Sequence, residues 1–322
     1  MIVSVGTFNL NNLFSRFNFE AELSSLKDLE NGITFSGHET DTDGKIFKVR
    51  TYKGKLVTQK EPERSAIVAE RIKRMNLDVL AVQEVEDRDA LQEFNATFLD
   101  NMYSFIGVID GNDPRLIDVG IMSKLPIGGL TSWQYTTHPR VPNRPIFSRD
   151  VLEVEILARD RSKKLFTLYN NHLKSHFVDF REDPEVGAQR NNETRQRQAE
   201  SLADIIKQRT RSGSNYIVTG DMNDPVDSTF LEPLTKDTEL DLVNALVNPT
   251  ETQPFKDEVA TTSWTHRFKE SGKPAHYELF DHIWLSPNLA EGQQQAVIDR
   301  RKLASGDGSD HDPAWVVLEI SN

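Results

Sequence analysis

The polar segment 308–313, near the end of the chain, carries side chains that can act together on a phosphate ester. Asp310 directly precedes His311, so the carboxylate can ligate a metal ion while the imidazole faces a reacting phosphorus atom. Asp281, on an earlier segment, can hold that imidazole and raise its basicity, as carboxylate–histidine pairs generally do. A loop of this composition is usually only a turn, but the three side chains together indicate metal-assisted hydrolysis.

Three other segments carry side chains suited to the same chemistry. Asp221 and Asn223 would lie on one side of an extended segment, because side chains alternate along a strand. The simpler explanation of this pair is an Asx turn before Pro225. Glu84 closes an apolar run, where a carboxylate is ordinarily solvated, and Asn9 could equally cap a turn. Their combination with the C-terminal segment favours a common site.

These segments belong to an ordered set of motifs that extends from residue 7 to residue 311. The set comprises segments 8–9, 83–84, 119–124, 171–173, 220–223, 281–283 and 309–311. In this order the motifs resemble those of the endonuclease/exonuclease/phosphatase superfamily, the deoxyribonuclease I-like proteins. The row Asn-His-Leu-Lys-Ser-His at 171–176 is closest to bacterial nucleases of that superfamily. Any one motif is weak evidence, but seven in order are strong.

The resemblance implies a role for each of these side chains. It implies a Mg²⁺ site, which Mn²⁺ could also fill, with ligands from Asn9, Glu84 and Asp310. It implies a catalytic set composed of His172, Asp221, Asn223, Asp281 and His311. It implies phosphate binding by Arg149, Lys174 and Asn223. In this scheme Asp221 orients or deprotonates the attacking water, His311 is the general base or a phosphate ligand, and Asp281 orients His311.

Several of the cationic side chains also have an ordinary structural explanation. A lone histidine after a strand, such as His172, is more often a structural residue. An arginine at a strand start, such as Arg149, more often forms a surface salt bridge. Three further arginines would usually form a solvated helix face, and would supply a basic patch if they are functional: Arg190, Arg195 and Arg197.

The charge balance limits how the chain can bind nucleic acid. The 322 residues carry 50 acidic and 38 basic side chains, a net charge of −12. Polynucleotides are bound largely through their phosphates, so this balance disfavours broad, non-specific affinity. Nucleic acid is still the expected substrate partner, provided that a local basic patch and a divalent ion reverse the field at the site.

Composition also bounds the partners and the compartment. The chain contains no cysteine, which excludes disulfide-linked partners and thiolate metal sites. No apolar run approaches the length of a membrane span, so no membrane association is expected. Residues 1–5 carry no basic leader, which favours a cytoplasmic protein, whereas a signal already removed would make it a secreted bacterial one. The sequence leaves the oligomeric state open.

Hydrophobic periodicity predicts strands and helices in one domain, 1–322. Residues 11–62 are polar and irregular, which indicates an insertion with a hairpin around 46–58, and residues 176–192 read as a loop. These patterns alone give an α/β or α+β class with two sheets, whereas the resemblance implies a four-layer sandwich of two packed mixed β-sheets flanked by helices. Strands are expected at 2–10, 77–84, 117–123, 151–157, 165–172, 216–220, 261–266, 280–285 and 314–320, and helices at 63–75, 89–99 and 193–209.

The sequence thus favours a metal-dependent phosphodiesterase that hydrolyses phosphate esters by activated-water attack, and within that class a nuclease acting on DNA or RNA. The second candidate is a phosphatase or a phospholipase C-type hydrolase acting on inositol phosphates or sphingomyelin, which the acidic charge balance keeps open. The third is a catalytically inactive binding module with the same fold, against which the intact set of site residues argues.

Overall fold

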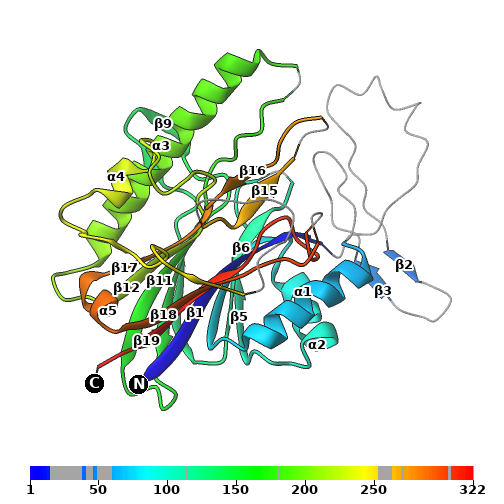
Figure 1. The fold of residues 1–322 in the computed structure, drawn as a ribbon, viewed down its shortest axis with the longest axis vertical. Helices are drawn as coiled ribbons and strands as arrows, with labels where there is room; N and C mark the ends of the chain where they lie inside the picture. The colour runs from blue at the N-terminus through cyan, green and yellow to red at the C-terminus, as the bar shows by residue number, and fades with distance from the viewer. Residues whose placement is uncertain are drawn as a thin grey trace.

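Two β-sheets packed face to face form the centre of the molecule, and helices cover their outer faces (Figure 1). None of the helices in the part of the chain that the structure covers is both long and apolar enough to cross a membrane. The computed structural model describes residues 1–14, 38–40, 46–48, 60–113, 115–179, 181–252, 263–269, 272–303 and 306–321.

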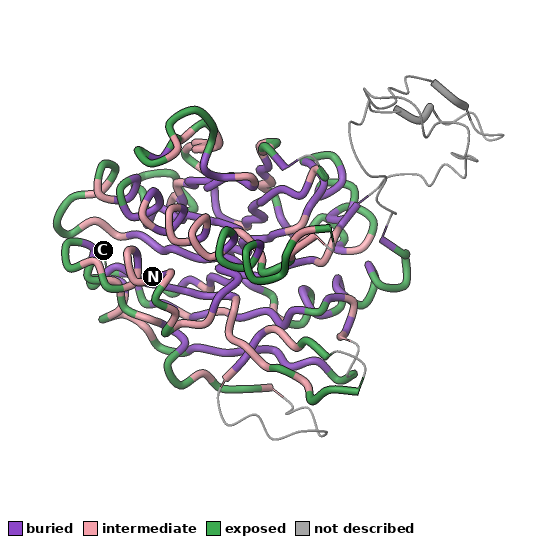
Figure 2. The backbone as a smooth tube through the Cα atoms, turned by 90° about the horizontal axis from the view of Figure 1, so that it is seen from above, coloured by how far each residue is buried: buried purple, intermediate pink, exposed green. Residues whose placement is uncertain are grey.

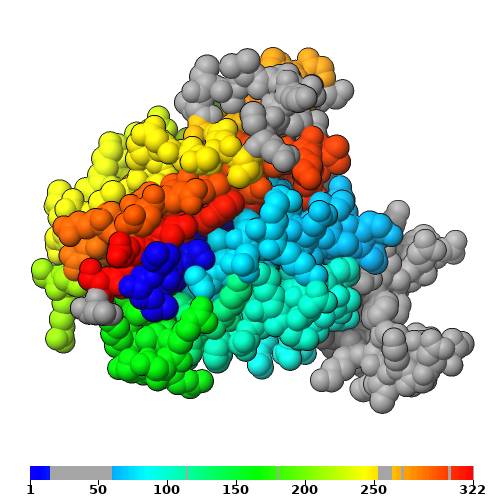
Figure 3. All heavy atoms as spheres, turned by 60° about the horizontal axis from the view of Figure 1, so that its bottom comes forward, coloured from blue at the N-terminus to red at the C-terminus, as the bar shows by residue number. Residues whose placement is uncertain are grey.

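The first sheet has seven strands in the order β14-β18-β19-β1-β4-β6-β5. Its central strand β1 pairs in parallel with β4 and antiparallel with β19, so Asn9 lies opposite Gln83, and Thr7 lies opposite Ala314. The strands are β1 (Ile2–Leu13), β4 (Val79–Val85), β5 (Phe105–Val108), β6 (Asp118–Ser123), β14 (Thr250–Thr252), β18 (Gln293–Asp299) and β19 (Ala314–Glu319). Figure 3 shows the first and last strands side by side on one face of the molecule.

The second sheet has six strands in the order β13-β17-β12-β11-β10-β7. Its register places Asp221 opposite His172 on one side and opposite Asp281 on the other. The strands are β7 (Ile127–Ser132), β10 (Val151–Leu157), β11 (Lys164–His172), β12 (Tyr216–Asp221), β13 (Val243–Asn244) and β17 (Asp281–Leu285).

Three apolar clusters hold the layers together. The first lies between the sheets, where Val5 and Ile121 of one sheet share a cluster with Leu168 of the other. The second packs helix α3 (Pro184–Arg209) on the outer face of the second sheet, and the third packs α1 (Pro62–Met75) and α2 (Arg88–Phe98) on the first. Figure 2 shows buried backbone through the strands and exposed backbone in the outer loops. The four-layer sandwich implied by the resemblance is therefore confirmed.

Short elements complete the described chain. Two are single-turn helices, α4 (Glu232–Thr235) and α5 (Pro287–Glu291). The others are three two-stranded pairs: β2 (His38–Thr40) with β3 (Ile46–Lys48), β8 (Thr137–His138) with β9 (Val141–Pro145), and β15 (His266–Phe268) with β16 (His276–Glu278).

Two expectations are corrected by the helices. Helix α3 begins at Pro184, so residues 184–192 are helical and not part of a loop. The side chain of Asp183 caps its start by accepting hydrogen bonds from two backbone N–H groups, and proline is well suited to the first helical position. The helical spacing of 63–75 also predicts Ile67 on the inward face of α1, but Ile67 is exposed, while Val68 and Ile72 face the core.

The expected insertion at 11–62 is only partly described. Strand β1 continues to Leu13, three residues beyond the expected end, although Asn11 and Asn12 have φ angles of +48° and +59°. The described strand pair joins 38–40 to 46–48, upstream of the expected hairpin at 46–58. Residues 49–59 lie outside the described part of the chain, and the single-domain organisation stays a prediction.

Candidate functional site

The predicted site residues lie at one edge of the sandwich, because the strands that carry them end there. Strands β11, β12 and β17 bring three of them into register, and β1 and β4 bring two more from the other sheet. The loop before β19 adds Asp310 and His311. Its Ser309 hydroxyl donates to the Asn9 carbonyl at 2.7 Å and accepts from the His311 N–H at 3.1 Å.

Glycine is required where β12 approaches β11. Gly220 has a φ of +130°, and a side chain there would place its Cβ 1.9 Å from the Asn171 carbonyl oxygen. The next residue, Asp221, accepts a hydrogen bond at 2.9 Å from the backbone N–H of Asn223, which has a φ of +52°. The expected strand-like alternation of Asp221 and Asn223 is therefore wrong, because an Asx turn positions Asn223.

His311 is held by a buried carboxylate. Its Nδ1 lies 2.7 Å from Asp281 Oδ2, and the backbone N–H of Asp281 donates to the Thr265 hydroxyl at 3.0 Å. This contact directs the other ring nitrogen, Nε2, toward Asp221 Oδ2 at 3.7 Å. The imidazole thus has one nitrogen occupied by the protein and one facing the site.

The carboxylate of Asp221 is the centre of the site. Its Oδ2 accepts a hydrogen bond from Asn9 Nδ2 at 2.9 Å and lies 3.5 Å from His172 Nε2. His311 approaches the same oxygen. Asn9 of the first sheet and the two predicted catalytic histidines therefore meet at one oxygen atom of the second sheet.

Burial and charge shift the pKa values of these groups in opposite directions. Burial lowers the pKa of His311, but the carboxylates of Asp281 and Asp221 outweigh it, so the pKa is raised well above its usual value. Burial, reinforced by nearby Arg149, lowers the pKa of His172 well below its usual value. Burial raises the pKa of Asp221, against the influence of His311. The two histidines therefore favour different protonation states.

A cationic flank lies beside this centre. Arg149 is buried, with its Nε 3.2 Å from Asp113 Oδ2 and its Nη1 donating to the Leu173 carbonyl. Arg115, which sequence reasoning missed, binds the same Asp113 carboxylate at 3.0 Å and has a 46% exposed side chain. Lys174 is half-buried, and burial together with Arg149 lowers its pKa to about 8. The only sequence signal for Arg115 was its position just before a strand of the motif set.

The helix arginines do not form the basic patch that was the alternative to a solvated helix face. Arg195 is fully buried, pairs with Asp224 at 3.0 Å and donates to the Lys174 carbonyl, so its assignment to a solvent-facing patch is wrong. Arg190 pairs with Glu182, and Arg197 pairs with Glu193. Their positive charges are largely neutralised on the protein itself.

A buried amide beneath the site ties the two sheets together. Asn170 of β11 accepts a hydrogen bond at 2.7 Å from Gln83 of β4. Its own Nδ2 donates to the Val82 carbonyl at 3.0 Å and to the Gly120 carbonyl of β6 at 2.8 Å. Asn170 was not singled out from the sequence, because its function depends on the packing of one sheet on the other.

A comparison with protein-family models identifies the family of this chain. The model described as "Endonuclease/Exonuclease/phosphatase family" matches residues 6–311, which includes every motif of the ordered set. The chain belongs to this family. A search of curated proteins found no match.

Solved structures with the same fold include members of the endonuclease/exonuclease/phosphatase family. One from Bacteroides vulgatus has a TM-score of 0.61 at 17% identity, with 100% of both chains covered. A mannosyl-6-phosphatase from Bacteroides thetaiotaomicron has a TM-score of 0.58 at 14% identity, covering 98% of this chain and all of its own. An AP endonuclease from Archaeoglobus fulgidus has a TM-score of 0.57 at 16% identity, covering 99% of this chain and all of its own.

Family members are generally dependent on a divalent metal, and the acidic residues of this site fit such an ion. Glu84 Oε2 accepts from the Asn12 N–H at 3.0 Å, and Glu84 forms no ion pair within the described residues. Burial, together with nearby Asp310, raises the pKa of Glu84. Asp310 accepts from Asn11 Nδ2 at 2.7 Å and has a 51% exposed side chain. Two neighbouring carboxylates fit a hard divalent ion, and buried Lys60, which donates to the Asn11 carbonyl, is the protein cation near them.

The backbone is strained at the first of these carboxylates. Glu84 has a φ of +59°, which side chains other than glycine rarely adopt. His266 adds a nitrogen near the second carboxylate, since a group formed by His266, Asp310 and His311 has its ligand atoms within 4.8 Å of one another. A second such group is formed by Asp221, Asp281 and His311.

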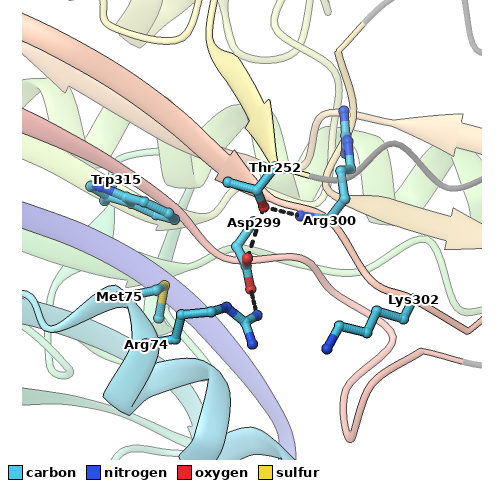
Figure 4. Close-up of a pocket in the computed structure, with 7 residues that line it drawn as sticks. All are labelled: Arg74, Met75, Thr252, Asp299, Arg300, Lys302 and Trp315. Atoms are coloured by element: carbon cyan, nitrogen blue, oxygen red, sulfur yellow. Dashed lines mark hydrogen bonds and ion pairs between the residues drawn. The ribbon is translucent and has the colours of Figure 1, made fainter.

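A separate hollow of about 250 Å³ lies between the end of α1 and the ends of β14 and β18 (Figure 4). Asp299, at its centre, pairs with Arg74 at 2.5 Å and with Arg71 at 3.1 Å, and Arg71 also pairs with Asp312 at 3.0 Å. These buried pairs hold the chain next to His311 in place. The hollow is lined by Arg74, Met75, Thr252, Asp299, Arg300, Lys302 and Trp315.

Proposed function

We propose that this protein is a divalent-metal-dependent phosphodiesterase that cleaves nucleic acid by in-line attack of water on phosphorus. The observation that carries the proposal is the convergence on Asp221 Oδ2. It lies within 2.9 Å of Asn9 Nδ2, 3.5 Å of His172 Nε2 and 3.7 Å of His311 Nε2. Such a preorganised set of donors and acceptors suits a reaction in which charge develops on phosphoryl oxygens.

The geometry supports a division of roles. Glu84, Asp310 and Asn9 would hold Mg²⁺, or Mn²⁺ in its place, and the ion would neutralise charge on phosphoryl oxygens. Asp221 orients the attacking water and accepts its proton, because its carboxylate is the acceptor at the centre of the site.

The remaining residues act on the phosphate. His311, fixed by Asp281, binds a phosphoryl oxygen through Nε2. Asn223 contacts the scissile phosphate, and His172 stabilises the leaving oxygen. Arg149 contributes charge from beneath the site, while Lys174 is the more accessible cation.

A polynucleotide is favoured as substrate because the cationic flank includes two partly exposed cations, Arg115 and Lys174, besides buried Arg149. Arg115 and Lys174 both lie on the solvent side of buried Arg149. A phosphomonoesterase is the second candidate, since the chain has a net charge of −12 and shares its fold with a mannosyl-6-phosphatase. An inactive binding module is disfavoured by the complete set of catalytic side chains.

One substrate panel tests the proposal. The protein is incubated with supercoiled plasmid, linear duplex DNA, single-stranded DNA, RNA and a phosphomonoester, each with Mg²⁺, Mn²⁺ or EDTA. We expect metal-dependent cleavage of at least one polynucleotide and none in EDTA. Turnover in metal-free EDTA buffer would refute the metal dependence, and release of phosphate from the monoester alone would favour the phosphomonoesterase.

A further inference from the structure

A row of four aromatic rings leads outward from the reacting end of the site. The ring of His311 lies 4.8 Å, centre to centre, from that of His266. His266 stacks on Phe280 at 5.1 Å, and Phe280 stacks on His176 at 5.7 Å. The side chain of His176 is 51% exposed. The row therefore begins at the proposed phosphate site and ends at a ring that faces solvent.

The last ring of the row is held in place by the protein. Asp224 Oδ1 lies 3.2 Å from His176 Nε2, and Arg195 Nη2 lies 3.4 Å from the ring nitrogens. Asp224 and Arg195 also pair with each other at 3.0 Å, and both are buried. A fixed ring binds a planar group at a low cost in conformational entropy. The buried arginine of α3 thus positions a surface aromatic residue.

One cationic and two aromatic side chains lie close together in this stretch of the chain. Phe177 follows His176 and is 71% exposed, one of the most exposed large apolar side chains in the described residues. Lys174, two residues before His176, forms no side-chain hydrogen bond or ion pair within the described residues. Proteins that bind single-stranded nucleic acid combine such features, because bases stack on aromatic rings while cations follow the phosphates.

We propose that His176 and Phe177, at the outer end of this ring row, form a stacking subsite for one unpaired base on the strand that carries the scissile phosphate of a single-stranded polynucleotide. The inference rests on the proposed nuclease function and specifies its substrate class. A base that stacks on a side chain has left its own helical stack, so a fully paired duplex cannot use the subsite. Lys174 binds the adjacent backbone phosphate.

The test compares oligonucleotides that differ only in the bases around the scissile position. Cleavage of a single-stranded DNA is measured against the same strand with abasic residues flanking the scissile position, which keep every phosphate. Wild-type protein should show a KM about tenfold higher on the abasic strand. His176→Ala and Phe177→Ala should each raise KM on the normal strand several-fold and leave KM on the abasic strand unchanged. His176→Phe, which keeps a ring, should restore most of the loss.

A control and two outcomes separate this inference from the proposed function. Ile2→Ala removes an equally exposed apolar side chain at the opposite end of β1 and should change neither KM. Cleavage of normal and abasic strands with equal KM would overturn the stacking subsite while leaving the nuclease intact. Cleavage of the phosphomonoester but of no polynucleotide would overturn the proposed function, and the subsite with it.

Discussion

At the scale of single residues, the site separates the groups that react from the groups that hold them. His311 and Asp221 face the position proposed for the phosphate, whereas the Asp281 carboxylate contacts the far nitrogen of the His311 ring. Loss of a reacting group and loss of its holder should therefore have effects of different size.

His311→Ala and Asp221→Ala should each lower kcat by at least about 10²-fold, as loss of a general acid–base or charge-stabilising group typically does. Asp281→Asn should be milder, since the amide can still contact the ring. The measurement is steady-state cleavage with Mg²⁺, accompanied by thermal unfolding to verify the fold. Near-wild-type kcat for folded His311→Ala would show that its assigned role is wrong.

Asp118 should make stability depend on pH. Burial, only partly offset by the hydrogen bond from the Gly111 N–H, raises the pKa of Asp118 to about 7. The folded protein therefore binds a proton that the unfolded chain lacks between about pH 4 and 7, so stability falls as pH rises through that window. Asp118→Asn keeps the acceptor for Gly111 and removes the charge.

This variant should be more stable than wild type by about 1–2 kcal/mol at pH 8, with the difference shrinking toward pH 4. Urea unfolding of both proteins across that range measures it. A stability difference that does not change with pH would show that Asp118 does not titrate in this window.

At the scale of elements, the clearest structural device is the amide bridge between the sheets. Asn170→Ala removes a fully buried side chain that bonds to β4 and β6. It should cost about 2–4 kcal/mol of unfolding free energy, because polar groups of the first sheet lose their partner. Asn288→Ala, which removes an exposed hydrogen bond to the Gly213 carbonyl, is the matched control and should cost under about 0.5 kcal/mol. If urea unfolding gave the same loss of unfolding free energy for both variants, Asn170 would not be a stabilising bridge between the sheets.

The sequence predicted best those elements whose pattern is strong and local. The apolar run that became β4 and the strand β10, found at the expected bounds 151–157, fall in this group. Strand β7, with two glycines, and β18, which opens with three glutamines, were missed because pairing with neighbours, not composition, makes them strands. The start of α3 was missed because residues 184–192 are mostly polar and mostly exposed, so they show no apolar stripe.

The site residues also divide into those that the sequence identifies and those that depend on the tertiary fold. Its motif side chains were identified from their order along the chain, and the structure brings Asn9, His172, Asp221, Asp281 and His311 together. Arg115 and Arg195 could not be assigned from the sequence. Arg115 is partly exposed and pairs with Asp113, whereas Arg195 is buried and pairs with Asp224. Both the partner and the exposure of each arginine are set by the tertiary fold.

At the scale of the whole molecule, a net charge of −12 means that affinity for nucleic acid depends on few side chains. Lys174→Ala and Arg115→Ala should each reduce the slope of log Kd against log salt by roughly 0.7 for a single strand. Arg159→Ala, exposed and at the opposite end of the second sheet, is the control and should leave the slope unchanged. Binding of a fluorescent oligonucleotide in EDTA across salt concentrations measures this. An unchanged slope for both site variants would contradict the cationic flank.

The left-handed backbone of Glu84 should lower the stability of the protein, whereas its carboxylate is needed for the proposed activity. Glu84→Gly and Glu84→Ala both remove the carboxylate and should both abolish metal-dependent cleavage, but only glycine adopts a φ of +59° without strain. The glycine variant should therefore have a free energy of unfolding about 1 kcal/mol higher than that of the alanine variant, measured by urea unfolding. Equal stabilities would show that the strain is negligible. A difference would mean that the chain gives up stability at this position to keep the ligand that its chemistry requires.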